Sequence, residues 1–264
     1  MTLTKAQIDD YERDGFLILP NLFSAEEVAV LRARLPVLFA EDCEANVREK
    51  HGGEVRTAMG LHLRDPMFDR LVRHPRFIEP ALQLLGEDVY VQQVKVNVKA
   101  AFEGEVWQWH YDFATHHGED GVAEPRALNL HVFLDDVTEH NGPLYFIPGS
   151  PAHGPAPARL DTTTTSYDLW VVERDTVAVL AAERGLVAAT GPAGTALIFG
   201  DCLVHASPAN LSPWDRRIFS LIVNPVSNAL TRHQRPEHKH HRDLTPVRPL
   251  ADDCLLAPAA AGAP

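Results

Sequence analysis

The segment WQWHYDFATHHGEDG, residues 107–121, gathers three histidines and three carboxylates within fifteen residues. Two of these residues, His110 and Asp112, are separated by a single residue, so in an extended chain their side chains point to the same face, about 6–7 Å apart. Imidazole nitrogens and carboxylate oxygens are ligands for iron, and two histidines with one carboxylate leave coordination positions open for other molecules. The pair therefore predicts part of a metal site that needs a second histidine.

A histidine and an arginine much later in the chain are candidates to complete this site. His205 lies 93 residues after Asp112, in the segment FGDCLVHAS, next to an apolar strand candidate. This separation suits a strand that returns beside the first, and we take His205 as the third metal ligand. Arg216 follows eleven residues later, where the next strand candidate begins. Its planar guanidinium can hold a carboxylate through two hydrogen bonds, as a dicarboxylic cosubstrate requires.

Strands with one polar face are expected to position these residues. Residues 89–99 alternate, so Gln93, Lys95 and Asn97 share a face opposite a row of apolar side chains. Residues 128–134 repeat this pattern, and shorter strand candidates lie at 16–19, 144–147, 195–199 and 217–224. Strands of this kind suit a β-sandwich or barrel whose interior holds a ligand pocket.

Helices are predicted mainly in the first third of the chain. Residues 5–13 suit a short helix, and the segment SAEE, residues 24–27, is a capping box before a helix that we expect to be interrupted at Pro36. Pro66 and Pro75 stand where the first turn of a helix accepts proline. The sequence therefore predicts a mainly β fold with flanking helices, in which N-terminal helices support the β core.

The chain is expected to form a single domain over residues 1–231, followed by a tail. Residues 156–191 combine a TTTTS run, a YDLW segment and a helical pattern, and we interpret them as a lid-like insertion over a pocket. Residues 232–264 are rich in histidine, proline and alanine and are predicted to be poorly ordered.

Composition excludes several classes of partner. The net charge of −12 argues against a nucleic-acid-binding protein, which needs clustered Lys and Arg. No apolar run approaches the roughly 20 residues that span a bilayer, so no membrane association is expected. The acidic N-terminal segment lacks signal-peptide features, and the three cysteines form no CxxC pair, which favours a cytoplasmic location. A small-molecule substrate is the expected partner, bound by a monomer or a homodimer.

Several longer segments resemble a known family. QVKVNVKAAF, WQWHYDF, EDG, PRAL, NGPLYFIPGS and DGFLILPNLFSAEEV are similar to the phytanoyl-CoA dioxygenase family, and within it to the ectoine hydroxylase-like branch. The resemblance covers most of the chain and implies a double-stranded β-helix, or jelly-roll, core. It also implies an oxygenase that uses Fe(II), with 2-oxoglutarate and O2 as cosubstrates.

The resemblance assigns roles to individual residues. It implies that His110, Asp112 and His205 bind Fe(II) and that Arg216 pairs with the distal carboxylate of 2-oxoglutarate. Further candidates for the cosubstrate pocket are Asn97, Trp107, Ser207 and Lys95. The expected reaction is hydroxylation of an unactivated C–H bond, with succinate and CO2 as coproducts.

A departure from the resemblance bears on the substrate. Ectoine hydroxylases carry tryptophan at the position of His116, and a third aromatic wall corresponds here to Ser220, or to Phe219 if the strand register slips. We therefore expect a different small polar substrate, a free amino acid or related zwitterion in specialised, natural-product metabolism. The candidate substrate-binding residues are Gln93, Thr115, His116, Arg126 and Phe199; we expect Arg126 to bind a carboxylate and Gln93 an ammonium or amide group.

Four alternatives stay open at this point. The enzyme could be an ectoine 5-hydroxylase proper. The reaction could be desaturation, epoxidation or ring formation in place of hydroxylation. The fold could instead belong to a non-catalytic metal-binding jelly-roll protein, in which Arg216 would have no task. His116 could also be a surface histidine in a loop, without contact to any ligand.

Overall fold

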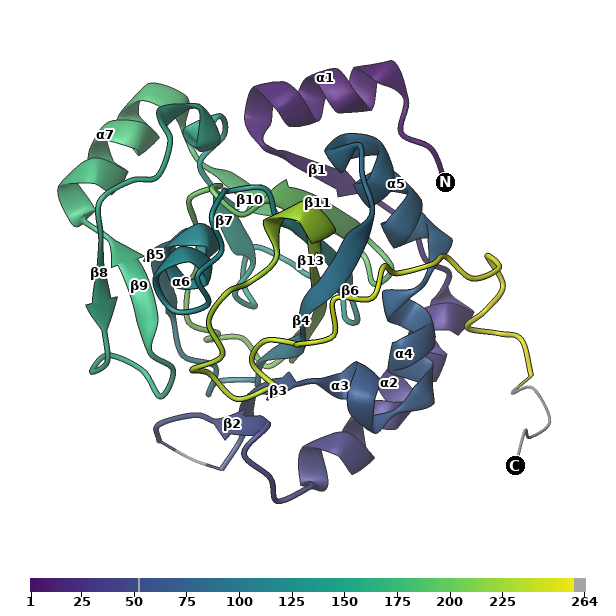
Figure 1. The fold of residues 1–264 in the computed structure, drawn as a ribbon. Helices are drawn as coiled ribbons and strands as arrows, with labels where there is room; N and C mark the ends of the chain where they lie inside the picture. The colour runs from purple at the N-terminus through teal and green to yellow at the C-terminus, as the bar shows by residue number, and fades with distance from the viewer. Residues whose placement is uncertain (52, 259–264) are drawn as a thin grey trace.

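Two antiparallel sheets form the core of the chain, which a computed structural model describes over residues 1–51 and 53–258. All pairings within both sheets are antiparallel, and together the sheets form the predicted jelly roll (Figure 1). The large sheet has the order β1 (Phe16–Leu19), β11 (Ala196–Gly200), β6 (Leu128–Phe133), β13 (Arg216–Pro225), β4 (Val89–Lys99), β3 (Val55–Met59) and β2 (Asn46–Arg48). The small sheet has the order β10 (Val187–Ala189), β7 (Leu144–Phe146), β12 (His205–Ser207) and β5 (Trp107–His110).

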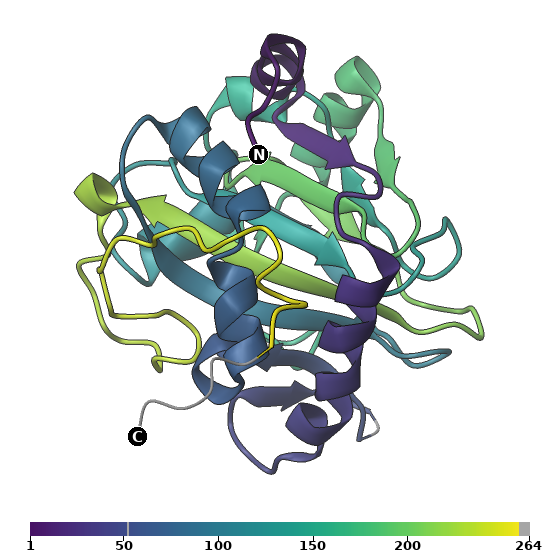
Figure 2. The ribbon, with the colours of Figure 1, turned by 90° about the vertical axis from the view of Figure 1, so that its right-hand side faces the viewer.

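Helices cover one face of the large sheet, as Figure 2 shows. Thr4 and Ser24 cap the first two helices through the reciprocal hydrogen bonds of a capping box. The second helix continues through Pro36 to Ala40, so the predicted interruption is wrong; Leu35 and Leu38, on either side of the proline, are both buried, and their packing stabilises the last turn. The helices are α1 (Lys5–Asp14), α2 (Ala25–Ala40), α3 (Leu61–Arg64), α4 (Pro66–Val72), α5 (Pro75–Leu85), α6 (Asp112–Gly118) and α7 (Arg174–Arg184), with 3-10 turns at Ser150–His153 and Val226–Asn228.

The main hydrophobic core lies between these helices and the large sheet. Phe219 of β13 stacks on Phe68 and Phe77, with ring centroids 5.8 Å and 6.3 Å apart. Val94 and Val96, on the apolar face of β4, belong to the same buried cluster. The polar side chains that alternate with them consequently point to the other face, toward the small sheet. The strand alternation thus leaves the space between the sheets available for a site.

Each helix in the described part of the chain is too short or too polar to cross a lipid bilayer.

Residues 232–258, which we call the C-terminal strap, make backbone hydrogen bonds to the rest of the protein that the prediction of a poorly ordered tail did not anticipate; residues 259–264 of that tail lie outside the described residues. The strap lies beside β4 and the helix layer, in yellow in Figures 1 and 2. The amides of His241 and Val247 donate to the carbonyls of Gln92 and Val89, in the part of β4 that β3 leaves unpaired. Composition suggested disorder, but these bonds satisfy an open strand edge and offset the entropy of ordering.

A pair of adjacent leucines tests how firmly the strap is packed. Leu255 is 1% exposed and belongs to the main core, whereas Leu256 is 50% exposed. Leu255→Ala is expected to lower the free energy of unfolding by about 2–5 kcal/mol, because it leaves a cavity in the core. Leu256→Ala is the control and should change it by less than about 0.5 kcal/mol in urea unfolding. Equal effects of the two substitutions would contradict this packing.

Residues 156–191, predicted to be an insertion, end in β10, which is the edge strand of the small sheet, and the residues before β10 lie outside that sheet. Their first part forms a hairpin of β8 (Ala158–Asp161) and β9 (Leu169–Val172), and β9 contacts β5. The ring of Tyr167, in the turn of the hairpin, lies 5.2 Å from the ring of Trp107. The segment therefore borders the region of the predicted metal site, and its closing as a lid stays a prediction.

Candidate active site

The three predicted metal ligands lie together at one end of the small sheet. His110 is the last residue of β5, His205 the first of β12, and the two are directly paired across the strands. Asp112 is not part of an extended segment, as we expected, but the first residue of α6. The turn into the helix still brings it to the histidines, since one donor atom from each of the three residues lies within 4.8 Å of the others.

Hydrogen bonds orient each of these side chains toward a common point. Nδ1 of His110 lies 2.6 Å from the carbonyl of Gln108, and Nδ1 of His205 lies 2.9 Å from that of Leu203. A carbonyl can only accept, so in both rings Nδ1 carries the proton and the lone pair is on Nε2. Asn129 donates to Oδ2 of Asp112 at 2.9 Å, which leaves Oδ1 free.

The charge states suit a divalent metal. Burial and the nearby His205 lower the pKa of His110 to about 3, and burial also lowers that of His205, so both rings are neutral ligands. Burial raises the pKa of Asp112, but the neighbouring His205, Lys95 and His110 outweigh this effect and hold it well below its usual range. Two neutral imidazoles and one carboxylate form the donor set that Fe(II) takes in oxygenases with open coordination positions. These residues therefore fit Fe(II).

A cavity extends from this triad between the two sheets. Strands β4, β6 and β13 supply one wall, and the small sheet, α6, the 156–191 segment and the strap supply the rest. The lining residues are Gln93, Lys95, Asn97, Trp107, His110, Asp112, Thr115, His116, Asn129, His131, Leu144, Tyr167, Leu169, His205, Arg216 and Arg235.

One end of the cavity has an arginine without an acidic partner. Arg216 is 1% exposed; its Nε donates to the carbonyl of Gly142 and its Nη2 to Oγ of Ser207, each at 2.9 Å. Burial lowers its pKa to about 9, and no carboxylate of the described residues forms a salt bridge with it. The buried Nε1 of Trp107 and Oδ1 of Asn97 also lack hydrogen-bond partners there. An anion such as the distal carboxylate of 2-oxoglutarate would stabilise this arginine.

The other predicted cosubstrate residues differ in position. Lys95 lines the cavity between Gln93 and Asn97 on β4, and burial lowers its pKa, which the charge of Asp112 partly opposes. Ser207 lies behind Arg216 and donates its hydroxyl to Gly142, so it orients the arginine rather than lining the cavity.

The predicted substrate residues separate into two groups. Gln93, Thr115 and His116 line the cavity. Arg126 does not; its guanidinium pairs with Glu87 at 2.6 Å and with Ser227, so the prediction that it binds a substrate carboxylate is corrected. Phe199 is also not a wall of the cavity, because its fully buried ring packs edge-on against His205, at 5.2 Å, and against His131.

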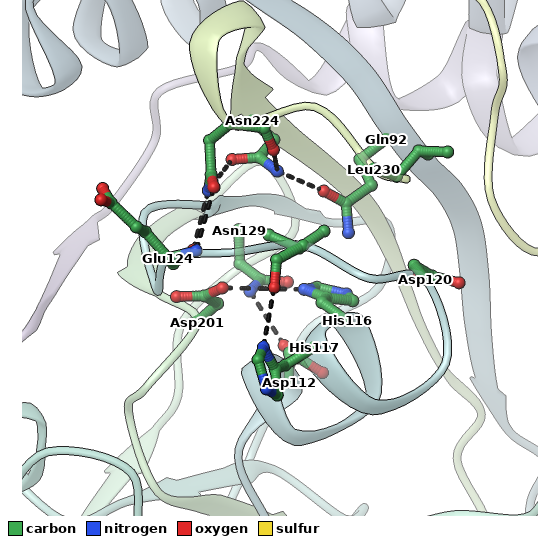
Figure 3. Close-up of polar contacts among 12 residues, drawn as sticks. Gln92, Asp112, His116, His117, Asp120, Glu124, Asn129, Asp201, Asn224 and Leu230 are labelled. Atoms are coloured by element: carbon green, nitrogen blue, oxygen red, sulfur yellow. Dashed lines mark hydrogen bonds and ion pairs between the residues drawn. The ribbon is translucent and has the colours of Figure 1, made fainter. Parts of the chain in front are cut away.

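His116 is not a surface histidine, since it is only 3% exposed. Its Nδ1 lies 3.7 Å from Oδ2 of Asp201, a residue of the turn between β11 and β12 (Figure 3). Burial raises the pKa of the Asp201 carboxyl to about 6, although His116 opposes that shift. Sequence spacing gave no indication of this pair, because 85 residues separate its members.

The residue that sequence analysis missed most clearly is Arg235 in the strap. Both oxygens of Asp120 accept from its guanidinium, at 2.8 Å and 2.5 Å, and Glu119 lies 3.5 Å away. The same carboxylate lies 2.6 Å from Nδ1 of His240. Arg235 was not predicted as a site residue because it lies in the tail that was expected to be disordered. The one related sequence signal was the EDG motif, which contains its partner Asp120. Tyr167, Leu169 and Leu144 are further wall residues that the sequence did not single out.

Comparison with known proteins agrees with this geometry. Residues 11–218 match the family model of phytanoyl-CoA dioxygenase (PhyH). An L-proline trans-4-hydroxylase of Streptomyces griseoviridis is 40% identical, over 93% of this chain and 95% of its own length. An ectoine dioxygenase of Bordetella bronchiseptica is 37% identical, over 94% of this chain and 86% of its own.

Solved structures give the same result. EctD of S. alaskensis, crystallised with 2-oxoglutarate and 5-hydroxyectoine, superposes with a TM-score of 0.83 at 34% identity, covering 94% of this chain and 87% of its own. The same protein with bound Fe gives a TM-score of 0.82. These relatives are oxygenases, which removes the support for a non-catalytic metal-binding protein.

Proposed function

We propose that this chain, which belongs to the phytanoyl-CoA dioxygenase family, hydroxylates a free amino acid. The chain is an Fe(II)- and 2-oxoglutarate-dependent dioxygenase. The observation that carries the proposed substrate class is the 40% identity to an L-proline trans-4-hydroxylase over nearly the full length of both chains. L-Proline is therefore the first candidate, and ectoine, the substrate named for several relatives at 37% identity or less, is the second.

The roles of the protein side chains follow from the geometry. His110, Asp112 and His205 would hold Fe(II), which with 2-oxoglutarate and O2 supplies the oxidant for an unactivated C–H bond. Arg216 would bind the distal carboxylate of the cosubstrate, beside Trp107 and Asn97. The task left to the other walls is to orient the target carbon and to exclude water.

Two arginines lie toward opposite ends of the cavity, and this arrangement suits two different anions. Arg216 pairs in register with Lys99, whereas Gln93, six residues earlier on β4, donates to the carbonyl of Lys239 in the strap. Six residues of strand span about 20 Å. The strap therefore meets β4 far from Arg216, and we assign Arg235 to the carboxylate of the amino acid.

Within the segment 156–191, the hairpin of β8 and β9 is proposed to act as a lid. Tyr167 and Leu169 line the cavity and shield it from the side opposite β4. A lid of this kind would keep water from the reacting atoms while substrate is bound. The monomeric or homodimeric state and the cytoplasmic, specialised-metabolic setting stay predictions.

A substrate panel tests the proposed function. Protein loaded anaerobically with Fe(II) and 2-oxoglutarate is mixed with oxygen and with L-proline, other free amino acids or ectoine. Succinate release and a product heavier by one oxygen atom are expected with at least one amino acid, L-proline first. Turnover of ectoine alone would favour the second candidate, and no stimulation by any amino acid would refute the proposal.

A substitution in the strap tests the assignment of Arg235. Arg235→Leu is expected to raise the KM for L-proline about 10- to 100-fold, the cost of one charged hydrogen-bonding group. The KM for 2-oxoglutarate should change little. Arg248→Leu is a control for the loss of an ion pair in the same strap, because Arg248 pairs with Asp88 at the surface, away from the cavity. An equal rise in both variants would point to loss of strap packing instead.

A further inference from the structure

Asp201 is a buried carboxylate, and its contacts are too distant to explain why a charged group is buried there. The residue is 1% exposed, and within the described part of the chain neither carboxylate oxygen makes a hydrogen bond. The nearest basic group is Nδ1 of His116, at 3.7 Å (Figure 3). A buried pair that only stabilised the fold would need closer contacts than these, because desolvation of the carboxylate costs several kcal/mol.

The backbone around Asp201 is held from both sides. Its amide donates to the carbonyl of Ala127 at 3.1 Å, and its own carbonyl accepts from the amide of Phe113 in α6 at 3.0 Å. The loop is therefore bound to the helix that carries His116. This arrangement fixes the side chain of Asp201 behind the imidazole ring, on the side away from the cavity.

The side chains that line the cavity do not include an acidic partner for the ammonium group of an amino acid. Among the described lining residues the basic side chains are Lys95, Arg216 and Arg235, of which Arg235 is already paired with Asp120, and the one carboxylate is Asp112. Asp112 belongs to the metal triad and is not free for a substrate. The ammonium group of an amino acid therefore finds no acidic side chain directly in the wall.

We propose that His116 and Asp201 form a dyad that recognises the cationic nitrogen of the substrate. His116 donates Nδ1–H toward Asp201 and presents the lone pair of Nε2 to an N–H of the ammonium group. The dyad carries one negative charge, on Asp201, and the neutral ring of His116 is the part of the dyad that contacts the substrate. This inference rests on the proposed function, because it concerns an amino-acid substrate bound to Arg235 through its carboxylate.

The position of the ring supports this assignment of the two nitrogens. Nδ1 of His116 is buried and faces the carboxylate, so the other ring nitrogen is the one left for the cavity that the ring lines. Burial raises the pKa of the Asp201 carboxyl to about 6, and the neighbouring His116 opposes that rise. Asp201 is accordingly a positioning residue that selects the tautomer of His116.

The test compares two ring molecules that differ in charge. L-Proline has a cationic ring nitrogen, and tetrahydrofuran-2-carboxylate has the same ring shape with a neutral oxygen. Wild-type enzyme is expected to prefer L-proline. In Asp201→Asn, which keeps the size of the side chain, the KM for L-proline should rise about 10- to 100-fold, with a smaller change in kcat. The KM for the ether should hold within about threefold, so the preference largely disappears.

A second variant and a control keep the outcome unambiguous. His116→Gln should show the same loss of preference, and it decides the matter if Asp201→Asn fails to fold by circular dichroism. His117→Gln, at the exposed neighbouring position, should behave as wild type. In all variants the KM for 2-oxoglutarate should hold. An unchanged preference for L-proline in Asp201→Asn and His116→Gln would overturn the dyad, whereas a wild-type enzyme inactive on every amino acid would refute the proposed function and the dyad with it.

Discussion

His110→Ala and Asp112→Ala are each expected to lower kcat/KM by about 1,000-fold or more, equivalent to roughly 4 kcal/mol of transition-state stabilisation. Each substitution removes one of three donors that converge within 4.8 Å. Two protein ligands hold a divalent ion much more weakly than three, so Fe(II) itself should be lost. Anaerobic Fe(II) titration and succinate release measure the two effects separately.

The matched control for this prediction is His117→Ala. His117 lies on the exposed side of α6, seven residues after His110, and its Nδ1 is within 2.9 Å of the carbonyl of Val122. Its removal should leave Fe(II) binding and turnover close to those of wild type. Retained turnover in Asp112→Ala would remove this residue from the iron site.

Arg216→Leu is expected to raise the KM for 2-oxoglutarate about 100-fold, because truncating one member of a buried charge pair costs roughly 2–5 kcal/mol. Arg216 has two polar contacts that orient it and no acidic partner among the described residues. Arg216→Lys should give an intermediate KM, since an ammonium group cannot form the same two-bond fork. Binding of 2-oxoglutarate under anaerobic conditions checks this order.

Arg217→Leu provides the control for Arg216. The neighbouring arginine points to the other side of β13, where it pairs with both oxygens of Asp135. Its loss should leave the KM for 2-oxoglutarate within about twofold of the wild-type value. A similar rise in both variants would mean that the effect comes from the strand and not from the cosubstrate site.

Much of this architecture could be predicted because it depends on the order of polar and apolar residues within short segments. The polar and apolar alternation of residues 89–99 predicted β4 with its bounds and its pocket-facing side chains. The sequence could single out His110, Asp112, His205 and Arg216 because their side-chain types and their spacing suit a metal ion and a carboxylate. Resemblance to the family added the jelly roll and the cofactors, and the comparisons confirm both.

What could not be predicted depends on contacts between distant segments. The strap has a composition typical of disorder, and only the unpaired edge of β4 explains its order. Arg126 and Arg235 carry the same charge, yet Glu87 holds the first outside the cavity while Asp120 directs the second into it. Burial of His116 likewise depends on Asp201, a residue whose own surroundings form only when β11 and β12 are in place.

The position of Arg235 in the strap has a consequence for the order in which the protein is made. All three proposed iron ligands have been synthesised by residue 205, and the proposed cosubstrate arginine by residue 216. The arginine that is proposed to bind the substrate follows only at residue 235. It belongs to the strap, which packs along β4 and the helices. A chain that stops before residue 235 therefore contains every proposed residue of the metal centre and lacks the arginine that is proposed to direct the substrate toward it.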